Sequence, residues 1–531
     1  MADSTRTIWR SASRFFSGTM LSRVTGMLRD MTMAFAFGTQ SSVAALLVAF
    51  RFAHLLRRLL GEGAMQTALI PHFEELRTQD PTRAGKFFCD LAVSLSHLLT
   101  LFILLTMAGL GGLLALDFLS PGNAEIVWLT LLMMPSLLFI CLFGINASLL
   151  QCEKHYFVPS AAPVVFNLFW MVGIVCAYFF ASSQAMTTLS LFIIAACFAQ
   201  WAITLPKVYT ILKGYGVNTL WKGSRRYSND VLNLGKPLAL GIVGIAASQI
   251  NNAFDAVFAR WADSEGPAIL WYAIRLQQLP LALFGIAIAG ALLPPLARAI
   301  KAHDIVQYNH FLKFALWRTL AFMIPITAAL FIMGDSCIAL IYGHGNFDNT
   351  SVVSTTQALW GYTFGLIPMA LILILAPAFY ARGNYRTPSM AATAAMGINI
   401  GLNTILVAGF GLGAASIAFA TSVSAWINLA WLSRALKNKG IALPLWNETG
   451  KIFAVSCVAM LAVVAVDQAI WGTATVVELV HGIIPFYEKS VVSQMLRLGI
   501  SGVTFFGVLG LAFLGHRFFT ASRLNAMDSV D

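Results

Sequence analysis

Apolar stretches of about 20 residues recur from one end of this 531-residue chain to the other. A helix of roughly 20 apolar residues crosses about 30 Å of hydrocarbon, and backbone that crosses must satisfy its own hydrogen bonds. Hydrophobic residues make up 58% of the chain and charged residues 11%, whereas soluble domains contain about 25% charged residues. We therefore expect an all-α polytopic membrane protein.

Fourteen such windows can be delimited, so we expect fourteen transmembrane helices. They lie at residues 16–38, 42–60, 87–116, 125–150, 158–182, 188–211, 232–260, 268–296, 311–334, 352–381, 389–410, 413–434, 450–472 and 495–517.

Lysine and arginine collect in alternate connections between these windows, as they do in cytoplasmic loops. One basic connection contains Arg77, Arg83 and Lys86, and a longer one runs from Lys207 to Lys236. The intervening connections are rich in acids and nearly empty of positive charge. This alternation predicts that both termini are cytoplasmic, and it explains the net charge of +11 without a nucleic-acid partner.

Two other features limit the possible roles. Residues Met1 to Arg14 are basic and polar, which argues against a removable signal peptide. The seven cysteines are scattered, mostly in apolar segments, and show neither CxxC nor Cys/His spacing. We expect them to be packing residues, and we expect no metal site.

Two pairs of short matches indicate an internal duplication. Thr67-Ala-Leu-Ile-Pro71 resembles Gly290-Ala-Leu-Leu-Pro294 at an offset of 223, and Tyr156-Phe-Val-Pro159 resembles Tyr385-Arg-Thr-Pro388 at an offset of 229. An offset of six helices predicts parallel repeats, an arrangement typical of alternating-access transporters. The expected organisation is an N-lobe of helices 1–6 (residues 1–213), a basic cytoplasmic linker (214–231), a C-lobe of helices 7–12 (232–440), and helices 13–14 with a C-terminal tail (441–531).

Six arginines fall inside predicted membrane segments: Arg23, Arg29, Arg51, Arg57, Arg58 and Arg275. A charged arginine costs roughly 2.5–3.5 kcal/mol at a helix centre even on the mildest scale, so it normally faces a hydrated cavity. The planar donor fork of arginine suits bidentate binding of phosphate oxygens. The set predicts a cationic cavity that binds an anionic, phosphate-bearing substrate.

Some of these arginines have a simpler interpretation. Arg57 and Arg58 can extend to the cytoplasmic boundary at the end of the second helix, as positively charged anchors do. Arg29 can pair locally with Asp30. We favour the cavity for Arg23, Arg29 and Arg275, and both interpretations stay open for Arg51 and Arg58.

Two stretches near the N-terminus form specific motifs, Ser22-Arg23-Val-Thr-Gly26-Met-Leu-Arg29-Asp30 and Phe50-Arg51-Phe-Ala-His54-Leu-Leu-Arg57-Arg58-Leu-Leu-Gly-Glu62-Gly63. They resemble motifs of the MurJ (MviN) family of lipid II flippases, which belongs to the MOP transporter superfamily. The resemblance continues in order through Asn167, Ser248-Gln249-Ile250-Asn251, Tyr272-Ala-Ile-Arg275 and Ala376-Pro-Ala-Phe-Tyr380, and covers residues 16–440.

The resemblance implies a bacterial inner-membrane protein that moves the undecaprenyl-pyrophosphate-linked peptidoglycan precursor, lipid II, from the cytoplasmic to the periplasmic leaflet. It implies cavity-lining roles for Arg23, Arg29, Arg57 and Arg275, a functional role for Glu62, and a lipid-tail groove beside the last two helices. Membrane lipids, and other cell-wall synthesis proteins, are the partners it suggests. No cofactor is implied, and because no ATP motif appears, the membrane potential or an ion gradient would drive transport.

The chain departs from the family pattern at three positions. Ala44 and Ile274 stand where many members carry Asp, and Leu373 stands where many carry a basic residue. The loss of two acids makes the predicted cavity more positive and places any ion-coupling role of those positions in doubt.

Three alternatives remain. A multidrug extruder of the same superfamily would present buried acids to a cationic drug, and the arginine set has the opposite sign. A flippase for another polyprenyl-linked glycan would need the same kind of cationic cavity. A membrane-bound glycosyl- or acyltransferase, an enzyme, would need a constellation such as His72, Glu74 and Glu75, which we interpret as the solvated face of an amphipathic connector.

Overall fold

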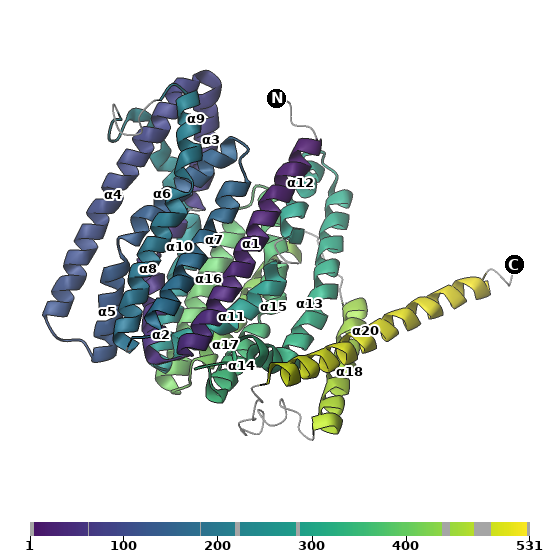
Figure 1. The fold of residues 1–531 in the computed structure, drawn as a ribbon. Helices are drawn as coiled ribbons and strands as arrows, with labels where there is room; N and C mark the ends of the chain where they lie inside the picture. Colours follow the sequence, from purple (N-terminus) through teal and green to yellow (C-terminus); the bar gives the residue numbers. More distant parts are fainter. Residues whose placement is uncertain are drawn as a thin grey trace. The chain divides into compact units, whose positions relative to one another are not determined.

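The computed structural model describes residues 5–61, 63–180, 182–217, 224–282, 287–437, 446–471 and 490–527. Within these ranges every regular element is a helix (Figure 1), so the expected all-α class is confirmed there. The chain divides into two compact units, Met1–Val257 and Phe258–Asp531. The limits predicted for the two lobes and the linker stay predictions.

The N-terminal unit contains nine α-helices, a π-helical turn and most of a tenth α-helix in its described part. They are α1 (Thr5–Phe37), α2 (Ser41–Ala53), η1 (Arg57–Gly61), α3 (Ala64–Gln79), α4 (Pro81–Ala115), α5 (Pro121–Met133), α6 (Ser136–Cys152), α7 (Phe157–Ala177), α8 (Ser182–Ala202), α9 (Leu205–Gly214) and α10 (Asn229–Ala262), which runs across the division between the units.

The described part of the C-terminal unit is helical in the same way. Its elements are α11 (Gly266–Pro280), α12 (Ala287–Lys301), α13 (Ile305–Tyr342), α14 (Asn349–Thr363), α15 (Leu366–Ala381), α16 (Arg386–Asn403), η3 (Thr404–Gly409), α17 (Ala415–Lys437), α18 (Trp446–Trp471) and α20 (Val491–Met527).

Eight helices in the described ranges are long and apolar enough to cross a membrane, and two bent pairs bring the number to ten. The pairs are α5 with α6, bent by 47°, and α14 with α15, bent by 40°. The first bend falls at Pro135, which lacks the N–H that a continuous helix requires. Each of the fourteen predicted windows lies on one helix or on two consecutive helices, but the count of fourteen spans is not confirmed.

Helix starts follow local chemistry. The Asp80 carboxylate accepts a hydrogen bond from the Thr82 N–H at 2.9 Å, and Pro81 occupies the first turn of α4, where its missing N–H is harmless. Asp304 and Asp348 cap α13 and α14 in the same way. Such caps fix where the membrane helices begin.

Close packing between α1 and α7 organises the N-terminal unit. A side chain at Gly18 would place its Cβ 2.1 Å from the Ser160 Oγ of α7, and a Cβ at Gly26 would lie 3.6 Å from the Asn167 amide nitrogen. Small residues allow membrane helices to approach closely. As a result the polar residues of α1 face those of α7 across a short gap.

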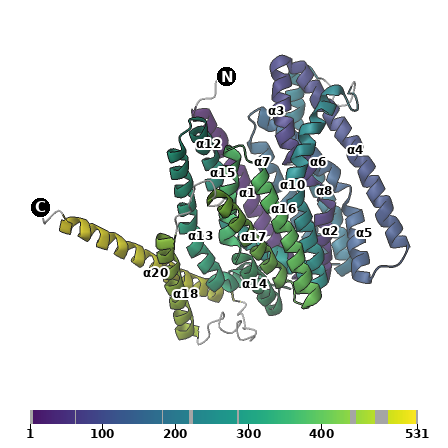
Figure 2. The ribbon, with the colours of Figure 1, turned by 180° about the vertical axis from the view of Figure 1, so that it is seen from behind.

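The core of the C-terminal unit surrounds the long helix α13. Leu312, Leu316, Ile374 and Leu375 belong to a buried cluster shared by α12, α13, α15 and α17. The last two helices pack on the other half of α13 through Ile332, Val463 and Phe505. Helices α18 and α20 also contact each other (Figure 2), and an ion pair of 3.1 Å joins Asp467 to Arg497.

Candidate functional site

Arg29 is buried on α1, with 7% of its surface exposed. Its Nε and Nη2 donate to the Oδ1 of Asp30 at 3.1 and 2.7 Å, and its Nη1 donates to the Oδ1 of Asn167 at 3.1 Å. The guanidinium carbon lies 4.6 Å from the centroid of the Trp170 ring. The local pair with Asp30 is therefore present, and α7 supplies two further contacts that fix the orientation of the guanidinium.

Asn167 uses both ends of its side-chain amide. Its Nδ2 donates to the Ser22 carbonyl at 3.1 Å and to the Thr25 Oγ1 at 3.0 Å, while its Oδ1 accepts from Arg29. A buried polar group is stable only when it is hydrogen-bonded, and a fully bonded network is rigid. The network therefore locks one face of α1 onto α7.

Arg23 lies on a different face of α1. Six residues separate it from Arg29, which corresponds to about 120° of rotation in an α-helix. Its side chain is exposed, and in the described part of the chain we find no hydrogen bond or ion pair to it. Of Arg23 and Arg29, Arg23 is thus the one that can meet an external anion without breaking a contact within the described residues.

The predicted basic segment after α2 is described in part. Arg51 lies in the last turn of α2, and its Nη1 donates to the Asn252 carbonyl of α10 at 3.4 Å. The half-buried Arg57 begins the π-helical turn η1. The side chain of Arg58, and Glu62 entirely, lie outside the described residues. The choice between boundary anchor and substrate contact stays open for Arg51 and Arg58.

Gly144 allows α6 to pack closely against η1. A Cβ at Gly144 of α6 would lie 1.7 Å from the Gly61 carbonyl oxygen, so only glycine fits there. Nearby, His54 Nε2 and Ser136 Oγ share a hydrogen bond of 2.8 Å, and His54 is buried. The packing of η1 on α6 thus positions Arg57, while His54 has a structural contact.

Arg275 occupies a comparable setting in the C-terminal unit. Its guanidinium carbon lies 4.3 Å from the centroid of the Trp271 ring, one turn earlier on α11. Around it the helix is anchored, because Tyr272 is fully buried among Tyr342 and Phe347. Each unit thus holds one of the predicted arginines against a tryptophan face, where cation–π attraction applies.

The residues considered for an enzyme form no catalytic constellation. Glu74 pairs with Arg77, which also bonds Glu153 at 2.8 Å. His72 Nε2 contacts the Asp230 carbonyl at 3.1 Å, and in the described ranges no three His, Cys, Asp or Glu side chains could hold a metal ion. Helix α3 buries one apolar face through Met65, Leu69, Phe73 and Leu76.

Side chains of α4 bind the end of the basic linker and the start of α10. The Arg225 N–H donates to the buried Asp90 carboxylate at 2.7 Å, and the Tyr227 N–H donates to Ser94 Oγ at 2.9 Å. Arg83 holds Asp230 through hydrogen bonds of 3.0 and 2.7 Å, which lower the pKa of that carboxyl. Burial, and a hydrogen bond to Glu153, raise the pKa of Tyr215 to about 12.

Sequence reasoning missed the partners of the arginines. Trp170 and Trp271 were not predicted, although a tryptophan at each site makes the cation–π contact. Asn167 entered only through a family motif. A single amide inside an apolar helix is a usable signal, since it must find a hydrogen-bond partner.

Comparison with known proteins identifies the family. The family model "Lipid II flippase MurJ" matches residues 33–487 of the chain. The chain belongs to the MurJ family of lipid II flippases. It is therefore a transporter and not an enzyme, and the family places it in the bacterial inner membrane in peptidoglycan biosynthesis.

Individual relatives agree with this assignment. The probable lipid II flippase MurJ of Chlamydia muridarum is 32% identical over 89% of this chain and 87% of its own length. The probable lipid II flippase MurJ of Vibrio cholerae is 29% identical over 85% of this chain and 87% of its own length.

Solved structures show the same fold. A MurJ flippase in an inward closed conformation superposes with a TM-score of 0.73, at 23% identity over 93% of this chain and 99% of that one. An inward-facing multidrug transporter of the MATE family and MOP superfamily gives a TM-score of 0.64 at 13% identity, over 80% of this chain and 98% of that one. The fold is thus shared with a transporter of a different family.

Proposed function

We propose that this MurJ family member moves lipid II from the cytoplasmic to the periplasmic leaflet by alternating access, with Arg23, Arg29 and Arg275 binding the pyrophosphate. The observation that carries the proposal is the family match over residues 33–487. The contacts of the two tryptophan-backed arginines support the assignment of the anion site.

Arg29 is suited to be the fixed element of such a site. Three of its five N–H donors are used by Asp30 and Asn167, which leaves one donor on each terminal nitrogen for a phosphate oxygen. Because its orientation is already set, little side-chain entropy is lost when the anion binds. Each charge-assisted hydrogen bond then contributes about 1.5–3 kcal/mol.

Arg23 and Arg275 are suited to be the responsive elements. Arg23 is exposed, so ordering its side chain is part of binding. Arg275 rests on Trp271, a contact that holds the cation without neutralising it. An anion that gains contacts in one state of the cycle and loses them in the other shifts the equilibrium between the two states.

The proposed topology has fourteen spans with both termini in the cytoplasm. It is supported by the alternation of basic and acidic connections and by the agreement between each window and a helix or helix pair. Helices α18 and α20 would border the groove for the polyprenyl tail, as the family resemblance implies. Arg57, Arg58, Arg51 and Glu62 are retained as further candidate contacts.

We propose the membrane potential or an ion gradient as the energy source, without a cofactor. A charge that crosses the full potential changes its energy by about 2.3 kcal/mol per 100 mV. Ala44 is fully buried and Ile274 is half-buried beside Arg275. Because both side chains are aliphatic, neither position supplies an ionisable group. Any coupling acid must therefore lie elsewhere in the chain.

Two experiments test the function. Purified protein in liposomes should move lipid II across the bilayer without covalent change, and the gene should replace a depleted lipid II flippase in cells. Failure of both assays with well-folded protein would exclude the proposal. Transport of another polyprenyl-linked glycan in preference to lipid II would favour the related glycan flippase.

A further inference from the structure

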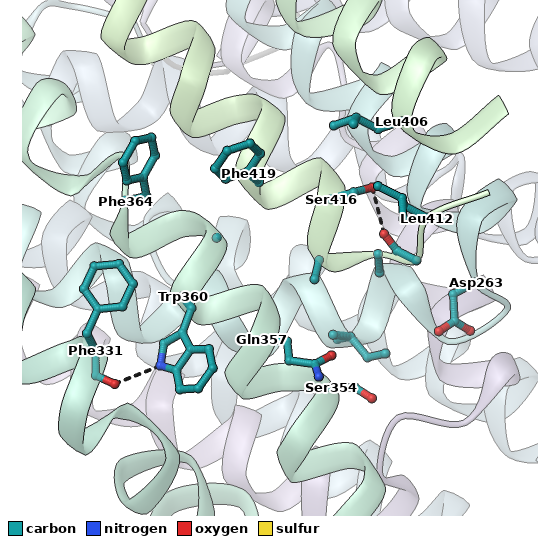
Figure 3. Close-up of a pocket in the computed structure, with 15 residues that line it drawn as sticks. Asp263, Phe331, Ser354, Gln357, Trp360, Phe364, Leu406, Leu412, Ser416 and Phe419 are labelled. Atoms are coloured by element: carbon teal, nitrogen blue, oxygen red, sulfur yellow. Dashed lines mark hydrogen bonds between the residues drawn. The ribbon is translucent and has the colours of Figure 1, made fainter. Parts of the chain in front are cut away.

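A cavity of about 670 Å³ opens on the C-terminal unit between α14 and α17. Figure 3 shows that its polar and aromatic groups are separated. Asp263 and Ser416 lie toward one end, whereas Phe331 and Phe364 lie toward the other. The cavity is therefore amphipathic along its length, and its volume falls in the roughly 300–1,000 Å³ range of ligand sites.

The N-terminal unit has a second cavity, of about 690 Å³. It lies between α5 and α8, and Glu125, Trp128, Phe180 and Gln184 are among its lining residues. It too combines one carboxylate, one tryptophan, a phenylalanine and amide or hydroxyl groups.

The two cavities are related by a constant shift along the sequence. An offset of 232 residues connects six lining residues of the first with six of the second. The pairs include Trp128 with Trp360, Phe180 with Leu412, Gln184 with Ser416, and Glu125 with Gln357. In the predicted duplication α5 and α8 correspond to α14 and α17, so each repeat carries a cavity at the corresponding place, although the carboxylate of each stands at a different position.

Aromatic side chains in the walls of both cavities are exposed, as lipid-facing side chains are. Phe364 and Phe419 are 41% and 47% exposed, and Trp128 and Phe180 are 45% and 51% exposed. The indoles are held in place, since Trp360 Nε1 donates to the Phe331 carbonyl at 2.9 Å and Trp128 Nε1 donates to Thr187 Oγ1 at 3.4 Å. Tryptophan gathers at head-group depth in membranes.

The charge of the cavities selects the head group. Each has one carboxylate, Asp263 or Glu125, and the described lining residues include neither lysine nor arginine. A carboxylate favours a cationic head group through Coulomb attraction and disfavours a purely anionic one. Hydroxyl and amide groups of Ser354, Gln357 and Thr187 can bind ester and phosphate oxygens.

We propose that these cavities are two phospholipid sites, one in each repeat, selective for lipids whose head group carries a free ammonium, such as phosphatidylethanolamine. The ammonium binds the carboxylate, Asp263 in one site and Glu125 in the other, and an acyl chain lies along the aromatic wall. None of the candidate transport arginines lines either cavity. With the proposed topology, both cavities open toward the outer leaflet of the membrane.

Native mass spectrometry of the purified full-length protein tests the proposal. The protein is titrated with dioleoyl phosphatidylethanolamine and, in parallel, with dioleoyl phosphatidylglycerol. We expect two selective binding events for the first lipid. Asp263→Asn and Glu125→Gln should each weaken one event roughly tenfold because each removes the charge that attracts the ammonium, and the double variant should weaken both.

The charge variants are conservative. The Asp263 Oδ1 accepts a hydrogen bond of 2.9 Å from the Glu265 N–H, and an asparagine oxygen can keep it. Asp348→Asn is the matched control, because exposed Asp348 lies in another acidic connection and lines neither cavity, and an asparagine oxygen can keep its hydrogen bond from the Ser351 N–H. Ser416→Phe and Gln184→Phe fill the cavities while keeping the carboxylates, and they should also remove one event each.

Three results would overturn the proposal. The first is equal binding of the two lipids, which would indicate a non-selective lipid shell. The second is an equal loss in Asp348→Asn. The third is a single selective event, which would contradict one site in each repeat.

Discussion

The side chain of Asn167 connects α7 to α1 through Arg29, with 3.1 Å between its Oδ1 and the guanidinium Nη1. The same amide donates to Ser22 and Thr25, one to two turns before Arg29. One residue of α7 therefore sets the position of α1 and the direction of its buried cation.

Removing this connection should impair transport more than folding. Because a hydrogen bond to a charged group contributes about 1.5–3 kcal/mol, we expect Asn167→Ala to lower lipid II translocation in liposomes at least roughly tenfold. Asn146→Ala is the control, since that buried amide donates to Thr204 at 2.8 Å and touches none of the predicted arginines. Equal activity of the two variants would contradict the assignment.

Arg23 and Arg29 should differ in their effect on stability. Exposed Arg23 has no internal partner in the described ranges, so Arg23→Ala should change the free energy of unfolding by less than about 0.5 kcal/mol while abolishing complementation. Arg29→Ala leaves the Asp30 carboxylate buried and should cost about 3–5 kcal/mol. Thermal unfolding of the detergent-purified variants measures the difference, and equal melting points would refute it.

Trp271 should tune the anion affinity of Arg275. Loss of a desolvated cation–π contact costs about 0.5–2 kcal/mol, so Trp271→Leu should weaken lipid II binding several-fold. Trp317→Leu removes a ring 5.4 Å from the Arg318 guanidinium, an arginine outside the predicted set, and should leave binding unchanged. Lipid II titrations followed by native mass spectrometry compare the two, and a similar loss in both would argue against a special role for Trp271.

Gly144 should tolerate no side chain. The Cβ of Gly144→Ala would lie 1.7 Å from the Gly61 carbonyl oxygen, and overpacking typically costs about 1–3 kcal/mol. We expect lower thermal stability and, because η1 carries Arg57, lower activity. Gly109→Ala provides the comparison, since no atom lies within 4 Å of its Cβ; wild-type stability of Gly144→Ala would show that η1 shifts freely.

The Arg83–Asp230 pair should make the linker sensitive to acid. The hydrogen bond from Arg83 lowers the folded-state pKa of Asp230, so its stabilisation is complete above the ordinary carboxyl pKa and is lost as the pH falls through the folded value. Both side chains are partly exposed, so solvent screening keeps the effect small.

Melting points of wild type and Asp230→Asn, compared from pH 7 down to pH 3, test this sign. The difference should be constant near neutral pH and should shrink in acid. A difference that grows toward low pH would show that the pair is not the cause.

The all-α class, the apolar helical segments and the candidate cations could be predicted from the order of residues alone. Runs of apolar residues predict helices because membrane backbone must bond within its own segment, and prolines and capping aspartates mark where helices break or begin. The arginines were predictable because charge in an apolar segment is costly and therefore rare.

The difference between the arginines comes from contacts that form when the helices pack together. The sequence places Arg23 and Arg29 six residues apart on one helix, yet Arg29 is engaged by Asn167 and Trp170 of α7 while Arg23 is exposed. The equivalence of Trp128 and Trp360 likewise became visible once both were found lining cavities. Helix periodicity records which face a residue lies on, but the choice of partner depends on contacts between segments more than a hundred residues apart, and no local pattern encodes those.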